Sequence, residues 1–159
     1  MANLENQYYR LEIDESNNFF SILSARSSLP DIRESRILIE GKVQGGPAFK
    51  FQADFRDPVD CANEEIEFDN TKNFKGIDRS SGIAWLVTFA LPSHEALVYL
   101  RVNLTNQSSK AVFLDKITLL EPQSAVESNI TFTASEEDAD LAFYANGWQS
   151  WSYTCTYEM

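Results

Sequence analysis

Apolar and polar residues alternate with a period of two along most of this 159-residue chain, and no other feature constrains the fold as strongly. Near the N-terminus, Tyr9, Leu11 and Ile13 alternate with the charged residues 10, 12 and 14, which is typical of a strand with one buried face. Clusters of turn-forming residues separate such stretches, and no long helical repeat interrupts them. The sequence therefore predicts an all-β protein.

We expect an antiparallel β-sandwich of the supersandwich type, built from eight to ten or more strands and forming one domain over residues 1–159. Alternation changes phase between Leu114 and Ile117, which predicts a bulge near Asp115 and Lys116. The segment 36–55 is a hairpin candidate, because a Gly-Gly-Pro turn divides it. The expected strands are 9–13, 19–24, 36–43, 48–55, 82–91, 97–105, 111–120, 129–133 and 141–144.

Residues 56–80 do not alternate in this way. They contain many acidic side chains and few apolar ones, so we expect an acidic loop there, with one short strand at 65–68. No internal repeat, low-complexity linker or domain boundary is visible along the chain.

The formal net charge of −11 disfavours binding to nucleic acid and to anionic membrane surfaces. No apolar run approaches the length of a membrane span, and the first residues do not resemble a secretory signal. We therefore expect a cytoplasmic protein, with Cys61 and Cys155 as reduced thiols.

Several classes of chemistry lack the residues they need. His94 is the only histidine of the chain and follows a proline in an expected turn, so we interpret it as a surface residue rather than part of a catalytic triad. One histidine and two distant cysteines do not make a zinc site, and no glycine-rich phosphate loop is present. We expect no metal and no cofactor.

Paired carboxylates would be needed for glycoside hydrolysis. Acidic residues cluster in three places, and each cluster lies in a polar stretch without apolar neighbours that would raise a pKa, so we interpret all three as solvated surface and assign no catalytic acid. The clusters are Asp54/Asp57/Asp60, Glu64/Glu65/Glu67 and Glu136/Glu137/Asp138/Asp140.

An aromatic segment at 143–159 is the strongest functional signal. It holds Trp148 and Trp151, two of the three tryptophans, beside the amides of Asn146 and Gln149. Indole rings and amides suit a surface that binds sugars, but aromatic rings also complete the cores of β-sandwiches. The residues alone leave both interpretations open.

Residues 146–152, Asn-Gly-Trp-Gln-Ser-Trp-Ser, resemble a signature of the melibiase-type α-galactosidases, a group that includes the raffinose synthases. In that family the signature lies late in an N-terminal β-sandwich, before a catalytic (β/α)8 barrel whose two aspartates perform retaining hydrolysis of α-galactosides. The present chain has the same order, with strand-rich sequence first and the motif after it. The resemblance implies an N-terminal domain without catalytic residues of its own, inactive alone, that packs on its own downstream barrel.

The resemblance also implies roles for individual residues. Trp151 would reach the edge of the galactose pocket, and Trp148 and Asn146 would shape the loop that presents it. Gln149 and Ser150 would be supporting polar groups. The substrate-binding candidates are therefore Trp151, Trp148, Asn146 and Gln149, and the sugar partner would be an α-galactoside bound by the parent enzyme.

Two other functions fit the same residues. The chain could be a free-standing carbohydrate-binding module that uses these tryptophans, or a structural or interaction domain whose aromatic segment is core. If, as the resemblance implies, a barrel normally covers the aromatic segment, its absence exposes apolar side chains, which predicts a homo-oligomer through residues 143–157. Trp85, in an apolar strand, is expected to be buried in every case.

Overall fold

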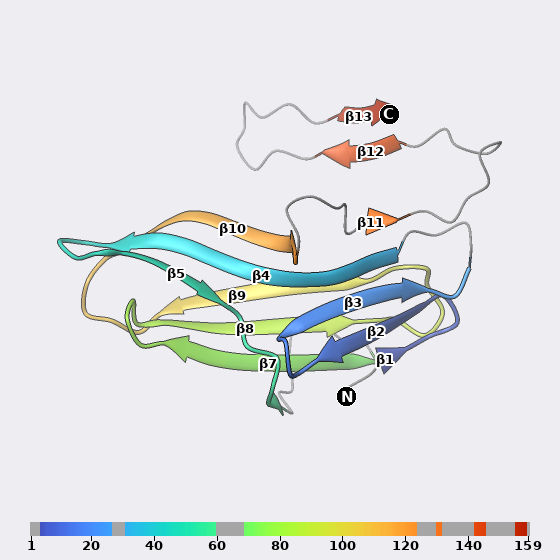
Figure 1. The fold of residues 1–159 in the computed structure, drawn as a ribbon, viewed down its shortest axis with the longest axis horizontal. Helices are drawn as coiled ribbons and strands as arrows, with labels where there is room; N and C mark the ends of the chain where they lie inside the picture. Colours follow the sequence, from blue (N-terminus) through green and yellow to red (C-terminus); the bar gives the residue numbers. More distant parts are fainter. Residues whose placement is uncertain are drawn as a thin grey trace.

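The structure is a computed structural model that describes residues 4–26, 31–59 and 69–123, together with the backbone of three short strands at 130–131, 142–145 and 155–158. Throughout these ranges the regular elements are β-strands, and every paired strand is antiparallel to its neighbour. Two of the sheets lie face to face in the manner of a β-sandwich (Figure 1). The all-β prediction is confirmed.

The larger sheet is organised around one long strand, β4. Along one edge β4 pairs with β3 and then β5, and along the other edge it pairs with β10 and β11. The outer strands β2 and β1 follow β3. The bounds are β1 (Leu4–Glu5), β2 (Tyr9–Asp14), β3 (Phe19–Ser24), β4 (Asp31–Val43), β5 (Ala48–Gln52), β10 (Val112–Pro122) and β11 (Ile130–Thr131).

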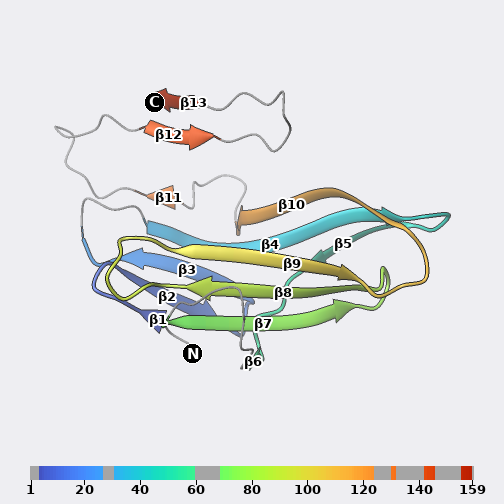
Figure 2. The same cartoon turned by 180° about the vertical axis from the view of Figure 1, so that it is seen from behind.

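The second sheet has the spatial order β6-β7-β8-β9, so its strands follow the chain order. Seen from the opposite side, these strands lie in front of the larger sheet (Figure 2). Two further strands, β12 and β13, pair only with each other. The bounds are β6 (Pro58–Val59), β7 (Thr71–Asp78), β8 (Ile83–Ala90), β9 (Tyr99–Asn106), β12 (Ala142–Ala145) and β13 (Cys155–Glu158).

Four phenylalanine rings join the two sheets at the centre of the core. Phe20 comes from β3, Phe74 from β7 and Phe89 from β8, while Phe55 lies in the connection after β5. Phe20 meets Phe89 with ring centroids 5.0 Å apart, and Phe55 meets Phe74 at 5.3 Å, both edge to face. All four side chains are at most 1% exposed. Contacts of this kind add about 0.5–1.5 kcal/mol per pair beyond the burial of area.

The expected hairpin at 36–55 is present, because β4 and β5 pair with Leu38 opposite Gln52. Its strands differ from the expected ones in length, since β4 begins at Asp31 and β5 ends at Gln52. The expected bulge is confirmed as well: the register of β10 against β4 shifts between Leu114 and Lys116.

The interpretation of residues 56–80 as an acidic loop was wrong for its second half. Residues 71–78 form β7, an eight-residue strand paired with β8 along its whole length. Asn73 and Phe74 are both buried although they are neighbours in the chain, so the strand shows no simple alternation. The short strand expected at 65–68 lies outside the described residues.

Candidate functional site

All four substrate-binding candidates from the sequence, Trp151, Trp148, Asn146 and Gln149, lie outside the residues that the structure describes, as does the rest of the aromatic signature. The backbone on either side is described: β12 and β13 pair with Ala145 opposite Cys155. Residues 146–154 lie between these two strands in the chain. The expected roles of the two tryptophans therefore remain predictions.

A cavity opens in the described part of the molecule where the edges of the two sheets come together, between β5 and β7. Its volume is about 260 Å³. Because β6 pairs only with residues 73 and 74, the outer edge of β7 beyond Phe74 has no partner strand among the described residues. We call this opening the Trp85 cavity, and its walls are Phe51, Gln52, Asp54, Asp57, Lys75, Gly76, Ile77, Asp78 and Trp85.

Trp85 forms the inner wall of this cavity. It lies on β8 on the same face as the buried residues Ile83 and Val87, and it is only 6% exposed. Its neighbour across β7 is Gly76. A Cβ atom at Gly76 would lie 2.8 Å from Cε2 and 3.1 Å from Nε1 of Trp85, so the indole occupies the space that a side chain at this position would need.

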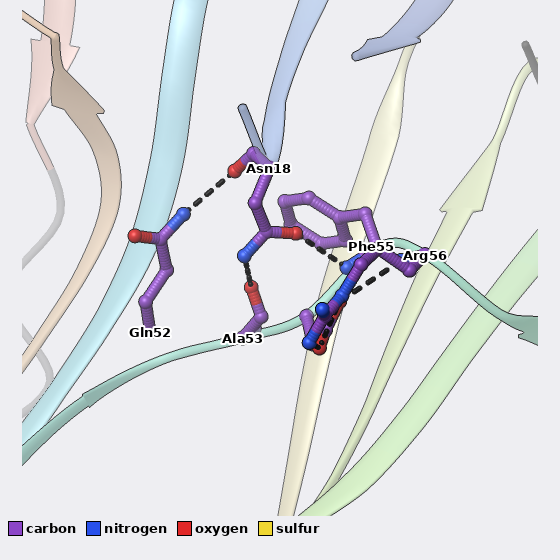
Figure 3. Close-up of polar contacts among 6 residues, drawn as sticks. Asn18, Gln52, Ala53, Phe55 and Arg56 are labelled. Carbon is purple, nitrogen blue, oxygen red and sulfur yellow. Dashed lines mark hydrogen bonds and ion pairs between the residues drawn. The ribbon is translucent and has the colours of Figure 1, made fainter. Parts of the chain in front are cut away.

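The opposite wall of the cavity is held in place by Asn18, in the turn between β2 and β3. Figure 3 shows its side chain between Ala53 and Phe55: the amide nitrogen donates to the carbonyl of Ala53 at 2.9 Å, and the amide oxygen accepts from the N–H of Phe55 at 2.6 Å. The side chain of Gln52 donates to the backbone carbonyl of Asn18 at 2.6 Å.

Asn18 has a φ of 60°, a left-handed conformation that asparagine tolerates better than most residues. One turn residue thus fixes the whole connection after β5, which carries Asp54 and Asp57 to the cavity. A sequence pattern does not reveal this link, because Asn18 and Phe55 are 37 residues apart.

Two of the three carboxylates at the cavity are already engaged. Asp54 accepts hydrogen bonds from the Arg56 guanidinium, and this interaction holds the pKa of Asp54 below its ordinary value. Partial burial by itself would raise the pKa of Asp78, but hydrogen bonds from Ser80 and Ser81 outweigh this and lower it. Both groups are therefore carboxylates at neutral pH.

Asp57 is exposed at the mouth of the cavity, in agreement with the interpretation of the acidic side chains as solvated. His94 is exposed in the connection between β8 and β9, as expected for a surface turn. In the described ranges, no three His, Cys, Asp or Glu side chains come together in a way that would hold a metal ion. Nor does the described part contain a helix of the length and apolarity needed to cross a bilayer.

A wider, shallower hollow of about 590 Å³ lies on the outer face of the second sheet. It shares four residues with the Trp85 cavity: Lys75, Gly76, Ile77 and Trp85. The remaining lining residues combine small apolar side chains with amides and a hydroxyl, and they are Ala84, Leu86, Asn103, Thr105 and Gln107. The two hollows therefore adjoin at Gly76, where the strand has no side chain.

The other open edge of the sandwich, between β9 and β10, is apolar. Phe113 is 57% exposed and Leu114 is 46% exposed, although both lie in a regular strand. Of the seven large hydrophobic side chains that are exposed among the described residues, six belong to β9, to β10 or to the residues just before β9; they are Leu97, Tyr99, Phe113, Leu114, Ile117 and Leu119. We call this set the β9–β10 apolar edge.

Trp85 was correctly expected to be buried, yet its place in a cavity wall was not foreseen. The alternation of β8 identifies it as a core residue, and it is one. The cavity lies beside the part of β7 beyond Phe74, with which β6 does not pair, and the indole fits against this strand because glycine lies opposite it. Both features depend on how the strands pair, β6 with β7 and β7 with β8, which the sequence pattern does not show.

Comparison of the chain with protein-family models, with curated proteins and with solved structures gave no match.

Proposed function

We propose that this chain is a non-catalytic β-sandwich domain of an α-galactosidase-like retaining glycoside hydrolase. It packs against a (β/α)8 barrel, and Trp151 extends to the sugar site of that barrel. The observation that carries the proposal is the resemblance of residues 146–152 to the family signature, at the end of a chain that folds as an antiparallel β-sandwich. The catalytic aspartates belong to the barrel, so the domain alone has no hydrolase activity.

The β9–β10 apolar edge supports this proposal. Leu114 and Ile117 lie on the same face of β10, because their partners on β4 are Gly41 and Ile39, and both are exposed. Exposed apolar side chains on one face of an edge strand are typical of a surface that another protein part covers. The strand β11, which leads toward the signature, lies on the same edge of β4 as β10. In the proposed parent enzyme, the barrel covers this edge and also meets the signature.

The test is a fusion in which this chain replaces the N-terminal sandwich of a melibiase-type α-galactosidase. We expect the fusion to hydrolyse an aryl α-galactoside faster than the isolated barrel does. In the fusion, Trp151→Ala should lower kcat/KM roughly tenfold to a hundredfold, which corresponds to about 1–3 kcal/mol of lost binding in the transition state.

Trp151→Phe is the matched control, because it keeps an aromatic ring and should retain most of the activity. Full activity of the Trp151→Ala fusion would contradict the role assigned to this residue. A fusion that is no more active than the barrel alone would contradict the domain assignment itself.

A further inference from the structure

Strand β10 forms one edge of the larger sheet. It pairs with β4 along one side, and no strand pairs with its other side in the part of the chain that the structure describes. At eleven residues it is long for an edge strand. A long unpaired edge offers backbone N–H and C=O groups to another strand, and proteins usually protect such an edge with charges or a bulge. β10 has both features, yet their arrangement leaves the strand complementary to itself.

The two charges of this edge lie side by side in the chain. Asp115 and Lys116 are the only charged residues of the segment 112–119, and both are exposed. Neither forms an ion pair within the described ranges, and Glu40, which lies opposite Lys116 on β4, is already paired with Lys50. The whole chain has a net charge of −11, but this segment is neutral, so two copies meet little repulsion here at close range.

The bulge decides which side chains of β10 share a face. In a regular strand, side chains three residues apart point to opposite faces. The register shift between Leu114 and Lys116 changes this, so that Leu114 and Ile117 lie on one face, opposite Gly41 and Ile39 of β4. Residues that lie directly opposite each other on two antiparallel strands must share a face. With the bulge, the strand meets this condition when it pairs with a copy of itself.

We propose that two copies of this chain associate through β10, antiparallel to each other, about a two-fold axis that passes between Asp115 and Lys116. In this register, Asp115 of each copy lies opposite Lys116 of the other, and Leu114 of each copy lies opposite Ile117 of the other. The axis repeats both contacts. The dimer therefore satisfies two opposite charges twice, covers exposed apolar side chains of both copies, and joins the two larger sheets into one continuous sheet.

This dimer goes beyond the function proposed above and does not depend on it. It also differs from the homo-oligomer expected from the sequence, which would form through residues 143–157. In the proposed parent enzyme, a barrel on the β9–β10 apolar edge would compete with the second copy. The inference therefore concerns the chain with this edge uncovered.

Charge reversal tests the register. Asp115→Lys and Lys116→Asp each place like charges opposite each other at both contacts, so each variant alone should dimerise roughly tenfold to a hundredfold more weakly than the natural chain. Sedimentation velocity over a range of concentrations measures this, and thermal unfolding checks that each variant folds. Lys75→Asp is the matched control: it makes the same change of charge at an exposed position on β7 and should leave the dimer unchanged.

An equimolar mixture of the two reversed variants gives the sharpest readout. In a mixed dimer, every contact between positions 115 and 116 joins a lysine to an aspartate, so the mixture should associate about as tightly as the natural chain. Both variants remain strongly acidic as whole chains, and non-specific attraction between them therefore cannot produce this result.

Three results would overturn the proposal. The first is a natural chain that stays monomeric at concentrations up to about 1 mM. The second is a dimer that neither charge reversal weakens, which would place the interface elsewhere, for instance at residues 143–157. The third is a mixture of the two variants that associates no better than either variant alone, which would rule out this register.

Discussion

The two open edges of the sandwich differ in the side chains that they present. At the β5–β7 edge, polar side chains surround a cavity, and the chain is fixed by hydrogen bonds from Asn18. At the β9–β10 edge, apolar side chains such as Phe113 face the solvent. The first edge thus ends in charged groups and amides around a hollow, whereas the second ends in large exposed apolar side chains. One sandwich can therefore present two chemically different surfaces at its two open edges.

The largest expected difference between the edges is in the stability lost when a phenylalanine is replaced by alanine. Phe55 is completely buried among three other rings behind the β5–β7 edge, whereas Phe113 is 57% exposed. Phe55→Ala should lower the free energy of unfolding by about 3–5 kcal/mol, because it leaves a cavity in the core. Phe113→Ala should change it by less than about 0.5 kcal/mol. Urea denaturation of both variants checks this, and equal losses would contradict the comparison.

The next effect concerns Asn18, which joins the turn after β2 to the connection after β5. Asn18→Ala removes two side-chain hydrogen bonds and places alanine at a φ of 60°, so we expect a loss of about 2–3 kcal/mol. Asn18→Gly removes the same bonds but tolerates the backbone, and should lose about 1–2 kcal/mol. Urea denaturation measures both, and a glycine variant as stable as the natural chain would show that the hydrogen bonds contribute nothing.

A smaller effect should appear in acid. The pKa of Asp78 is below its ordinary value of 3.8 in the folded chain, so its contribution to stability is present above pH 3.8 and is lost as the pH falls through the folded pKa. Asp78→Asn should cost about 1 kcal/mol at pH 7 and progressively less as the pH falls below 3.8. Thermal unfolding across this pH range tests the prediction. Asp115→Asn on the apolar edge serves as the comparison, and a pH-independent loss for Asp78→Asn would contradict it.

The smallest change in stability should come from the β9–β10 apolar edge. The double variant Phe113→Ser/Ile117→Ser should alter the free energy of unfolding by less than about 1 kcal/mol, because both side chains are more than 40% exposed. It should instead weaken any association of the isolated chain with itself. Sedimentation velocity over a range of concentrations measures this, and unchanged association would assign it to the segment 143–157 or to another surface.

Strands with clear alternation were predictable from the sequence, and so was the bulge at Asp115, because a change of phase in an edge strand is a local signal. The strand β7 was not, since its buried residues Asn73 and Phe74 are adjacent and depend on the packing of β8 and β6 against it. The alternation of apolar and polar residues therefore predicted most strands of the sandwich, but it did not predict β7, the strand that lines the cavity.

The candidate site was only partly predictable for the same reason. Trp85 was identified as a buried residue, but the opening beside it depends on contacts between distant segments. These are the Asn18–Phe55 hydrogen bond, the glycine opposite the indole, and the start of β6 at Pro58, which leaves β7 beyond Phe74 unpaired by β6. The resemblance around Trp151 rests on a local motif, and the role it implies stays a prediction because residues 146–154 lie outside the described ranges.

The central strand β4 has a consequence for how the chain reaches its fold. It is complete at Val43, yet β10, which covers much of its second edge, begins only at Val112. On the ribosome, that edge stays uncovered while some seventy further residues emerge. We therefore expect slow folding, because β4 and β10 are far apart in the sequence. Until β10 pairs with it, the exposed edge of β4 is where we expect chaperones to bind or nascent chains to aggregate.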